Sequence, residues 1–233
     1  MLKQHKLALI LTSIITILPV LLGLCIWNIL PEKIPIHFDI NGNPDGFANK
    51  AISVFVLPFS MLAVHWLCII CTAFLDPKSK NNLSSQAFNL VLWISPIISL
   101  VINAILYSYA LGYEINTVLV LNLLVGVMFI VIGILLPKCK QSYTIGIKLP
   151  WTLNDENNWN KTHRFGGVVF VIGGTVICAT SFLNSFWIML GVMIAMIALP
   201  IIYSLAFYLK TQKAKISENP NIKPEEKSDK NIK

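Results

Sequence analysis

Long apolar runs alternate with short polar stretches along most of the chain. About 20 apolar residues are needed to cross the hydrocarbon core of a bilayer as a helix. Because lipid offers no partner to an unpaired backbone group, each sufficiently long run is expected to be helical. The pattern therefore predicts an all-α integral membrane protein, a six-helix transmembrane bundle, with spans at Leu7–Leu30, Ala51–Leu75, Ala87–Gly112, Thr117–Leu136, Phe165–Phe182 and Phe186–Leu209.

Two polar stretches between these runs are longer and more patterned than simple connections, residues 31–50 and residues 137–164. We expect an N-terminal two-helix module over residues 1–86 that carries the first stretch. A four-helix module over residues 87–209 would carry the second. Residues 210–233 are rich in lysine and poor in apolar side chains, which predicts a disordered basic tail.

Composition and charge agree with a membrane protein. The chain is 55% hydrophobic and 12% charged, whereas a soluble domain carries about 25% charged residues, so an ordinary soluble enzyme and a disordered protein are both excluded. Of the 18 lysines and arginines, all but Lys33 and Lys50 would lie on one side of the predicted membrane. Basic loops favour the cytoplasmic side. We therefore expect a multi-pass cell-membrane protein with both termini in the cytoplasm. Its net charge of +7 then reflects topology and membrane lipid, and direct nucleic-acid binding is not expected.

The first patterned stretch reads PEKIPIHFDINGNPDGFANK. Apolar and other residues alternate from residue 34 to residue 40, which predicts a short strand with one buried face. Asn41-Gly42 follows, a pair that tolerates the backbone of a tight hairpin turn. The sequence thus predicts an ordered extracellular loop at residues 31–50.

The second stretch, PKCKQSYTIGIKLPWTLNDENNWNKTHR, leads into the fifth apolar run. Thr152 with Asp155 three residues later predicts a helix start with a threonine cap. Asp155, Trp159 and Thr162 with His163 would then share one helical stripe. Tryptophans and bases here fit simple membrane anchoring. Polar residues that anchoring does not need would instead expose a cytoplasmic recognition surface: Thr152, Asn154, Asp155, Glu156, Asn157, Asn158 and Asn160.

At these two loops the sequence resembles the SdpI family, the immunity proteins against a sporulation-delaying toxin. LPEKIPIHFDINGNPDGFANK resembles the extracellular signature of the family, and GIKLPWTLNDENNWNKTHRFGG resembles its cytoplasmic signature. The resemblance implies a six-helix membrane protein that protects a Gram-positive cell from a secreted, membrane-active peptide toxin. In signalling members, the toxin-occupied protein also recruits a helix-turn-helix autorepressor to the membrane.

The resemblance places the candidate sites in these two motifs. The extracellular toxin-facing motif comprises Pro35, His37, Asp39, Asn41, Gly42, Pro44, Asp45 and Gly46. The cytoplasmic partner-docking motif comprises Gly146, Lys148, Pro150, Trp151, Thr152, Asp155, Trp159, Thr162, His163, Arg164 and Gly167. Lys148 stands where the family often has arginine; it keeps the charge but lacks the planar donor fork. A Trp159→Ala substitution is expected to abolish repressor recruitment while leaving membrane insertion intact.

No catalytic residue, cofactor or metal site is predicted. Asn41, Asn43 and Asp45 resemble the first half of a calcium loop, but Ile52 stands where a bidentate glutamate is needed. Catalytic motifs such as H-E-x-x-H and G-x-S-x-G are absent from the sequence. His65 is the one titratable side chain near the middle of a span, and bonding within the bundle is the simpler role for it. An alternative function remains, a permease-like or accessory membrane component that binds or moves a small apolar molecule.

Overall fold

The computed structural model describes residues 5–75 and 85–218. Within these residues it confirms six helices that are long and apolar enough to cross a membrane. Three of them form the first half of the bundle: α1 (Lys6–Cys25), α2 (Leu57–Ile70) with the π-helical turns η1 (Ile52–Val56) and η2 (Cys71–Leu75), and α4 (Ser85–Ala110). The second half contains α5 (Thr117–Leu135), α7 (Glu156–Thr180) and α8 (Phe186–Glu218), with the 3-10 turns η3 (Leu136–Lys138) and η4 (Ser181–Leu183).

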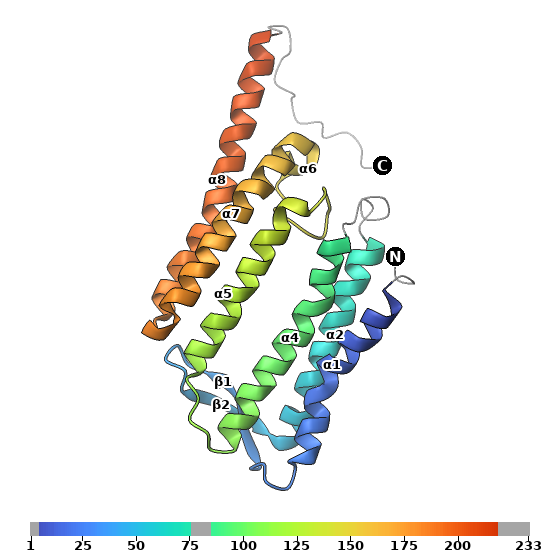
Figure 1. The fold of residues 1–233 in the computed structure, drawn as a ribbon, viewed down its shortest axis with the longest axis vertical. Helices are drawn as coiled ribbons and strands as arrows, with labels where there is room; N and C mark the ends of the chain where they lie inside the picture. Colours follow the sequence, from blue (N-terminus) through green and yellow to red (C-terminus); the bar gives the residue numbers. More distant parts are fainter. Residues whose placement is uncertain (1–4, 76–84, 219–233) are drawn as a thin grey trace, which may run out of the picture.

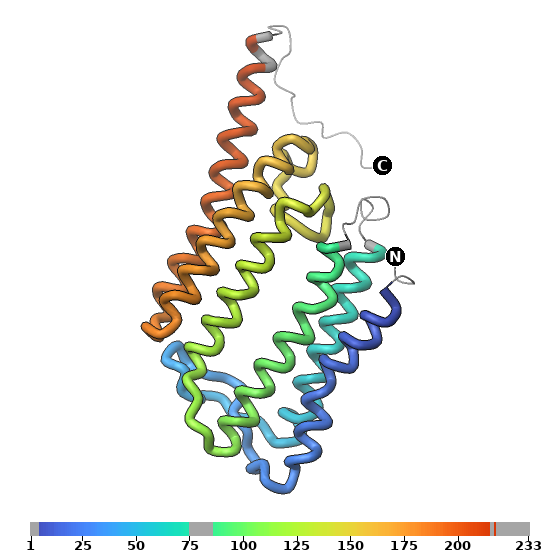
Figure 2. The backbone as a smooth tube through the Cα atoms, in the orientation of Figure 1, coloured from blue at the N-terminus to red at the C-terminus, as the bar shows by residue number. Residues whose placement is uncertain are grey.

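The two halves are defined by packing. α4 packs against α1 and α2, and α7 packs against α5 and α8, while α4 and α5 touch each other only slightly. The backbone tube shows the same grouping (Figure 2). The division therefore falls in the turn between α4 and α5, and not at residue 86 where we expected a module boundary.

Glycines allow the closest helix contact, between α5 and α7. A Cβ atom added to Gly133 would lie 2.7 Å from the carbonyl oxygen of Gly167, and one added to Gly126 would lie 2.8 Å from that of Gly174. Because real Cβ atoms do not approach so closely, only glycine permits this spacing. Small residues at helix contacts are typical of membrane bundles, where backbones gain by close approach.

Buried polar side chains join the helices of the first half. His65 is fully buried, and its Nε2 lies 3.2 Å from the hydroxyl of Thr12. One turn along α1, the carbonyl of Thr16 accepts a 2.8 Å hydrogen bond from Ser99 of α4. These bonds pair polar groups that would be costly to leave unpaired in lipid, although the Nδ1 atom of His65 has no hydrogen-bond partner. The interpretation of His65 as a residue bonded within the bundle is thus confirmed.

One helix boundary agrees with the sequence expectation in part and another differs from it. α7 begins at Glu156 and continues through the apolar run that starts at Phe165, so the predicted helical stripe and the fifth span belong to one helix. α8 continues to Glu218, so residues 210–218 are helical and do not belong to a disordered tail. The rest of the expected tail, residues 219–233, lies outside the described residues, as do Lys3, Lys78 and Lys80.

Candidate functional site

The first motif forms a β-hairpin across one end of the bundle (Figure 1). Strands β1 (Lys33–Phe38) and β2 (Pro44–Asn49) pair antiparallel, with Lys33 opposite Asn49 and Phe38 opposite Pro44. The ordered hairpin is as predicted, but the predicted alternation of burial is wrong. Ile34 is buried together with Pro35, whereas Ile36 is 39% exposed. Register shifts on both sides of His37 break the two-residue period.

The base of the hairpin is fixed to the first half of the bundle. Ile34 is fully buried in a cluster with Leu30, Val54 and Leu106. Lys50, only 8% exposed, ion-pairs with Glu32, and its ammonium lies 4.8 Å from the centre of the Trp27 ring. A buried lysine without such partners would be strongly unfavourable. The end of β2 is therefore anchored where α2 begins.

The hairpin tip reaches the second half. The Asp39 carboxylate accepts hydrogen bonds from the backbone N–H groups of Asn43 and Asn41 at 2.8 and 2.9 Å. These bonds hold the pKa of Asp39 below its usual value, and the bond from Asn43 has the larger effect. Gly42 has φ = +85°, and a Cβ there would lie 2.9 Å from a methyl group of Val118 at the start of α5. The hairpin thus spans both halves.

A polar pocket of about 510 Å³ opens beside the tip. The turn between α4 and α5 and the turn before α8 complete its wall with Glu114, Asn116 and Asn184. Asn184 has φ = +50° and is the one non-glycine residue with positive φ in the part of the chain that the structure describes. This left-handed backbone caps the 3-10 turn η4, a place where asparagine is common. Amides and one carboxylate can bond to the amide, hydroxyl and ammonium groups of a peptide.

The second motif lies at the opposite end of the bundle (Figure 1) and is organised around Trp159. Trp159 is fully buried, and its indole N–H donates to the carbonyl of Cys139 at 2.8 Å. Its ring stacks on His163 with centroids 3.9 Å apart. The Nε2 of His163 accepts from the backbone N–H of Ile147 at 3.0 Å, so its Nδ1 carries the proton and donates to the carbonyl of Trp159. Gly146, with φ = +121°, lies directly against both rings.

A second group of hydrogen bonds ties this motif to α8. The Asn158 amide donates to the carbonyl of Ser204, and its oxygen accepts from the hydroxyls of Ser204 and Thr162 at 2.8 and 2.9 Å. The indole N–H of Trp151 donates to the Ser204 hydroxyl at 2.8 Å. Asn158, Thr162 and Ser204 are fully buried. The network therefore joins α6 (Pro150–Asn154), α7 and α8.

The predicted helix cap at Thr152 is wrong. Thr152 lies inside α6, where its hydroxyl accepts from the backbone N–H of Leu149. Asp155 is the cap, because its extended backbone separates the two helices and its carboxylate accepts from the N–H groups of Asn157 and Asn158. An acid at a helix start also suits the helix dipole.

Much of the docking motif is not exposed, since Gly146, Trp151 and Asp155 are half-buried and only three of its members are exposed. Thr152, Trp159, Thr162, His163 and Gly167 are buried, whereas Lys148, Pro150 and Arg164 are exposed. Of the expected recognition surface, Thr152 and Asn158 are buried and Asp155 is half-buried. The exposed members are Asn154, Glu156, Asn157 and Asn160. Because Trp159 has no exposed surface, its removal would act through the folding of the loop and not through a lost contact with a partner.

Sequence reasoning missed Ser204 and Cys139. Both lie outside the docking motif and accept hydrogen bonds from its tryptophan side chains. Ser204 is the one serine in the apolar part of α8, and nothing in its neighbourhood signals a role. Cys139 contributes its backbone carbonyl, which no side-chain pattern reveals. Burial raises the pKa of its thiol to about 11, so the thiol stays protonated and is a poor nucleophile.

Comparisons with known proteins agree with the two-motif architecture. Residues 138–204 match the model of the SdpI/YfhL protein family, and residues 14–62 match that of a domain of unknown function, DUF1648. The chain is 31% identical to the immunity protein SdpI of Bacillus subtilis strain 168 over 201 residues, which cover 85% of this chain and 93% of the relative. The chain belongs to the SdpI family. It is thus a multi-pass membrane protein of the immunity type.

Each matched segment contains one motif. The SdpI/YfhL match contains α6, α7, Ser204 of α8 and the Trp159 loop, by which we mean residues 139–149, which pack against Trp159. The DUF1648 match contains the whole hairpin, most of α1 and the beginning of α2. No solved structure matches the chain.

Proposed function

We propose that this SdpI-family protein gives its cell resistance to a secreted, membrane-active peptide toxin that it meets at the hairpin end of the bundle. The observation that carries the proposal is the hairpin itself, whose base is buried in one half while its tip rests on α5 of the other. A ligand seated in the polar pocket contacts the hairpin tip, the α4–α5 turn and the turn before α8 together. Its binding energy then depends on how the two halves are arranged.

Charge at this end favours a basic peptide. Four carboxylates lie here, those of Glu32, Asp39, Asp45 and Glu114, together with two lysines. Lys50 is buried in its ion pair with Glu32. The surface therefore presents an excess of negative charge, which speeds the approach of a cation to it.

The cytoplasmic half of the proposal concerns a repressor. Lys148, Pro150, Arg164 and the exposed amides near the start of α7 form a polar surface that is rigid, because the buried network fixes the loop behind it. Signalling requires that the toxin bind one arrangement of the two halves more tightly than the other, since a ligand with equal affinity for both transmits nothing.

Two glycines provide the experiment. Gly42 and Gly112 both have φ = +85°, but an added Cβ meets Val118 at Gly42 and nothing within 4 Å at Gly112. A toxin-sensitive strain that expresses the protein should survive challenge, Gly42→Ala should lose protection, and Gly112→Ala should keep it at equal membrane abundance. Absence of protection by the unmodified chain would refute the proposal. Equal protection by both variants would exclude the hairpin tip as the site.

A separate assay addresses the repressor. Toxin should increase the amount of repressor that sediments with membranes, and Lys148→Ala with Arg164→Ala should remove this increase without altering toxin survival. Equal sedimentation with and without toxin would contradict the signalling half and leave the resistance half standing.

A further inference from the structure

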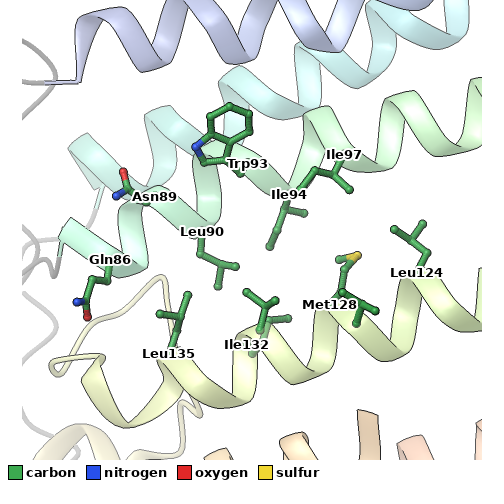
Figure 3. Close-up of a pocket in the computed structure, with 12 residues that line it drawn as sticks. Gln86, Asn89, Leu90, Trp93, Ile94, Ile97, Leu124, Met128, Ile132 and Leu135 are labelled. Carbon is green, nitrogen blue, oxygen red and sulfur yellow. The ribbon is translucent and has the colours of Figure 1, made fainter. Parts of the chain in front are cut away.

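An apolar groove separates the two halves along the face where α4 and α5 approach each other. It has a volume of about 360 Å³ and lies within the range of about 300–1,000 Å³ typical of small-molecule sites. Leu90 and Ile94 of α4 point toward Met128, Ile132 and Leu135 of α5 (Figure 3). Because these walls offer no hydrogen bonds, water gains little by filling the groove.

The groove is polar at one end only. Gln86 and Asn89, in the first two turns of α4, line the end that lies nearest the second motif. Lys138 ends the 3-10 turn η3, three residues after the groove-lining Leu135, and its side chain is exposed. α4 and η3 are in contact. Two amides therefore line this end of the groove, and an exposed lysine lies in the adjoining turn η3.

A smaller cavity of about 200 Å³ adjoins the groove. It shares Leu90, Ile132 and Leu135 with the groove and is closed on its far side by Gly146 and Ile147 of the second motif. A molecule in the groove would thus rest against the same side chains that support the loop.

We propose that the groove binds one acyl chain of an anionic glycerophospholipid, whose headgroup lies against Gln86, Asn89 and Lys138. An amphiphile with an apolar tail and a negative head matches the distribution of apolar walls and cationic end. Basic sites between transmembrane helices are known to hold anionic headgroups. The bound chain fills the space that α4 and α5 leave between the halves. This inference does not depend on the proposed function, because it concerns a lipid and not the toxin.

Native mass spectrometry of the full chain in detergent tests the inference. The purified protein should carry one phospholipid per chain. After delipidation it should rebind phosphatidylglycerol more tightly than phosphatidylethanolamine, and Lys138→Gln should remove that preference. Met128→Trp, which fills the groove, should weaken lipid binding about tenfold. Ile197→Trp is the matched control, since Ile197 lies 58% exposed on the face of α8, and it should leave lipid binding unchanged.

Three results would overturn the inference. Equal lipid binding by Met128→Trp and Ile197→Trp would show that the lipid is only part of the general annulus. A dimer that Met128→Trp dissociates would show that a second copy of the chain occupies the groove. A bound peptide in place of lipid would assign the groove to the toxin. Thermal unfolding is followed for each variant, and Ile94→Phe replaces Met128→Trp if the latter alters the unfolding midpoint.

Discussion

The buried network around Asn158 yields a quantitative prediction. Replacing Asn158 with alanine removes three hydrogen bonds, one to the Ser204 carbonyl and two from the hydroxyls of Ser204 and Thr162. A hydrogen bond contributes a net ~1 kcal/mol to stability, so the three together contribute about 3 kcal/mol. Thr162 can recover one bond by turning its hydroxyl to the backbone carbonyl four residues earlier, as Thr175 does. The expected loss is then about 2 kcal/mol in the free energy of unfolding.

Thermal unfolding in detergent, followed by a thiol-reactive dye, measures this loss. For a chain of this size, about 2 kcal/mol lowers the unfolding midpoint by about 4–8 °C. Asn157→Ala is the matched control, because Asn157 is the adjacent residue in α7 and its side chain is exposed. Its midpoint should not change. Equal midpoints for the two variants would refute the view that the Asn158 network holds α6, α7 and α8 together.

Three further substitutions test separate parts of the fold. Gly146→Ala places a Cβ 2.5 Å from Nε2 of His163 at a strained φ, so it should lower the free energy of unfolding by about 1–3 kcal/mol. The opened loop should make tryptophan fluorescence more sensitive to a soluble quencher. Gly191→Ala, with open space around it, should change neither quantity. Gly133→Leu should separate α5 from α7, because its side chain meets the backbone of that helix, and gel filtration should show aggregation or loss of the folded peak. Asp39→Ala should loosen the hairpin tip at neutral pH. In the unmodified chain the same loosening should appear only as the pH falls below 3.8, because the carboxylate with its lowered pKa stabilises the turn while ionised; cross-linking of the tip to α5 across a pH series measures both.

Hydropathy predicted the helices well because the lipid requirement is simple: a span must be long, apolar and helical. The start of α7 escaped this reasoning, since Glu156, Asn157 and Asn160 form helical turns outside the apolar core. Their helix is set by the Asp155 cap and by the burial of Trp159 against the loop, both of which depend on tertiary structure.

The two motifs were visible as motifs, but the direction of their side chains was not. Asn158 was expected on a recognition surface, whereas the structure turns its side chain inward toward Ser204. A one-dimensional pattern cannot show that a serine far along the chain supplies the missing partner. The hairpin failed in a similar way, because the irregular pairing at His37 shifts which side chains are buried.

The grouping of helices was also beyond the sequence. Both Gly126 and Gly133 lie on α5, and their spacing suggests a close contact without naming α7 as its partner. The contact between α4 and α5 is slight because each helix packs mainly within its own half of the bundle. No single residue pattern in the sequence predicts this arrangement.

The central claim is that the hairpin and the Trp159 loop face opposite compartments, so that one can meet an extracellular peptide and the other a cytoplasmic partner. Single cysteines at Asn41 and Asn157, both exposed, in a cysteine-free chain can be labelled in intact cells with a membrane-impermeant maleimide. The account predicts labelling of Asn41→Cys in intact cells and of Asn157→Cys only after lysis. Labelling of both positions from the same side would contradict it.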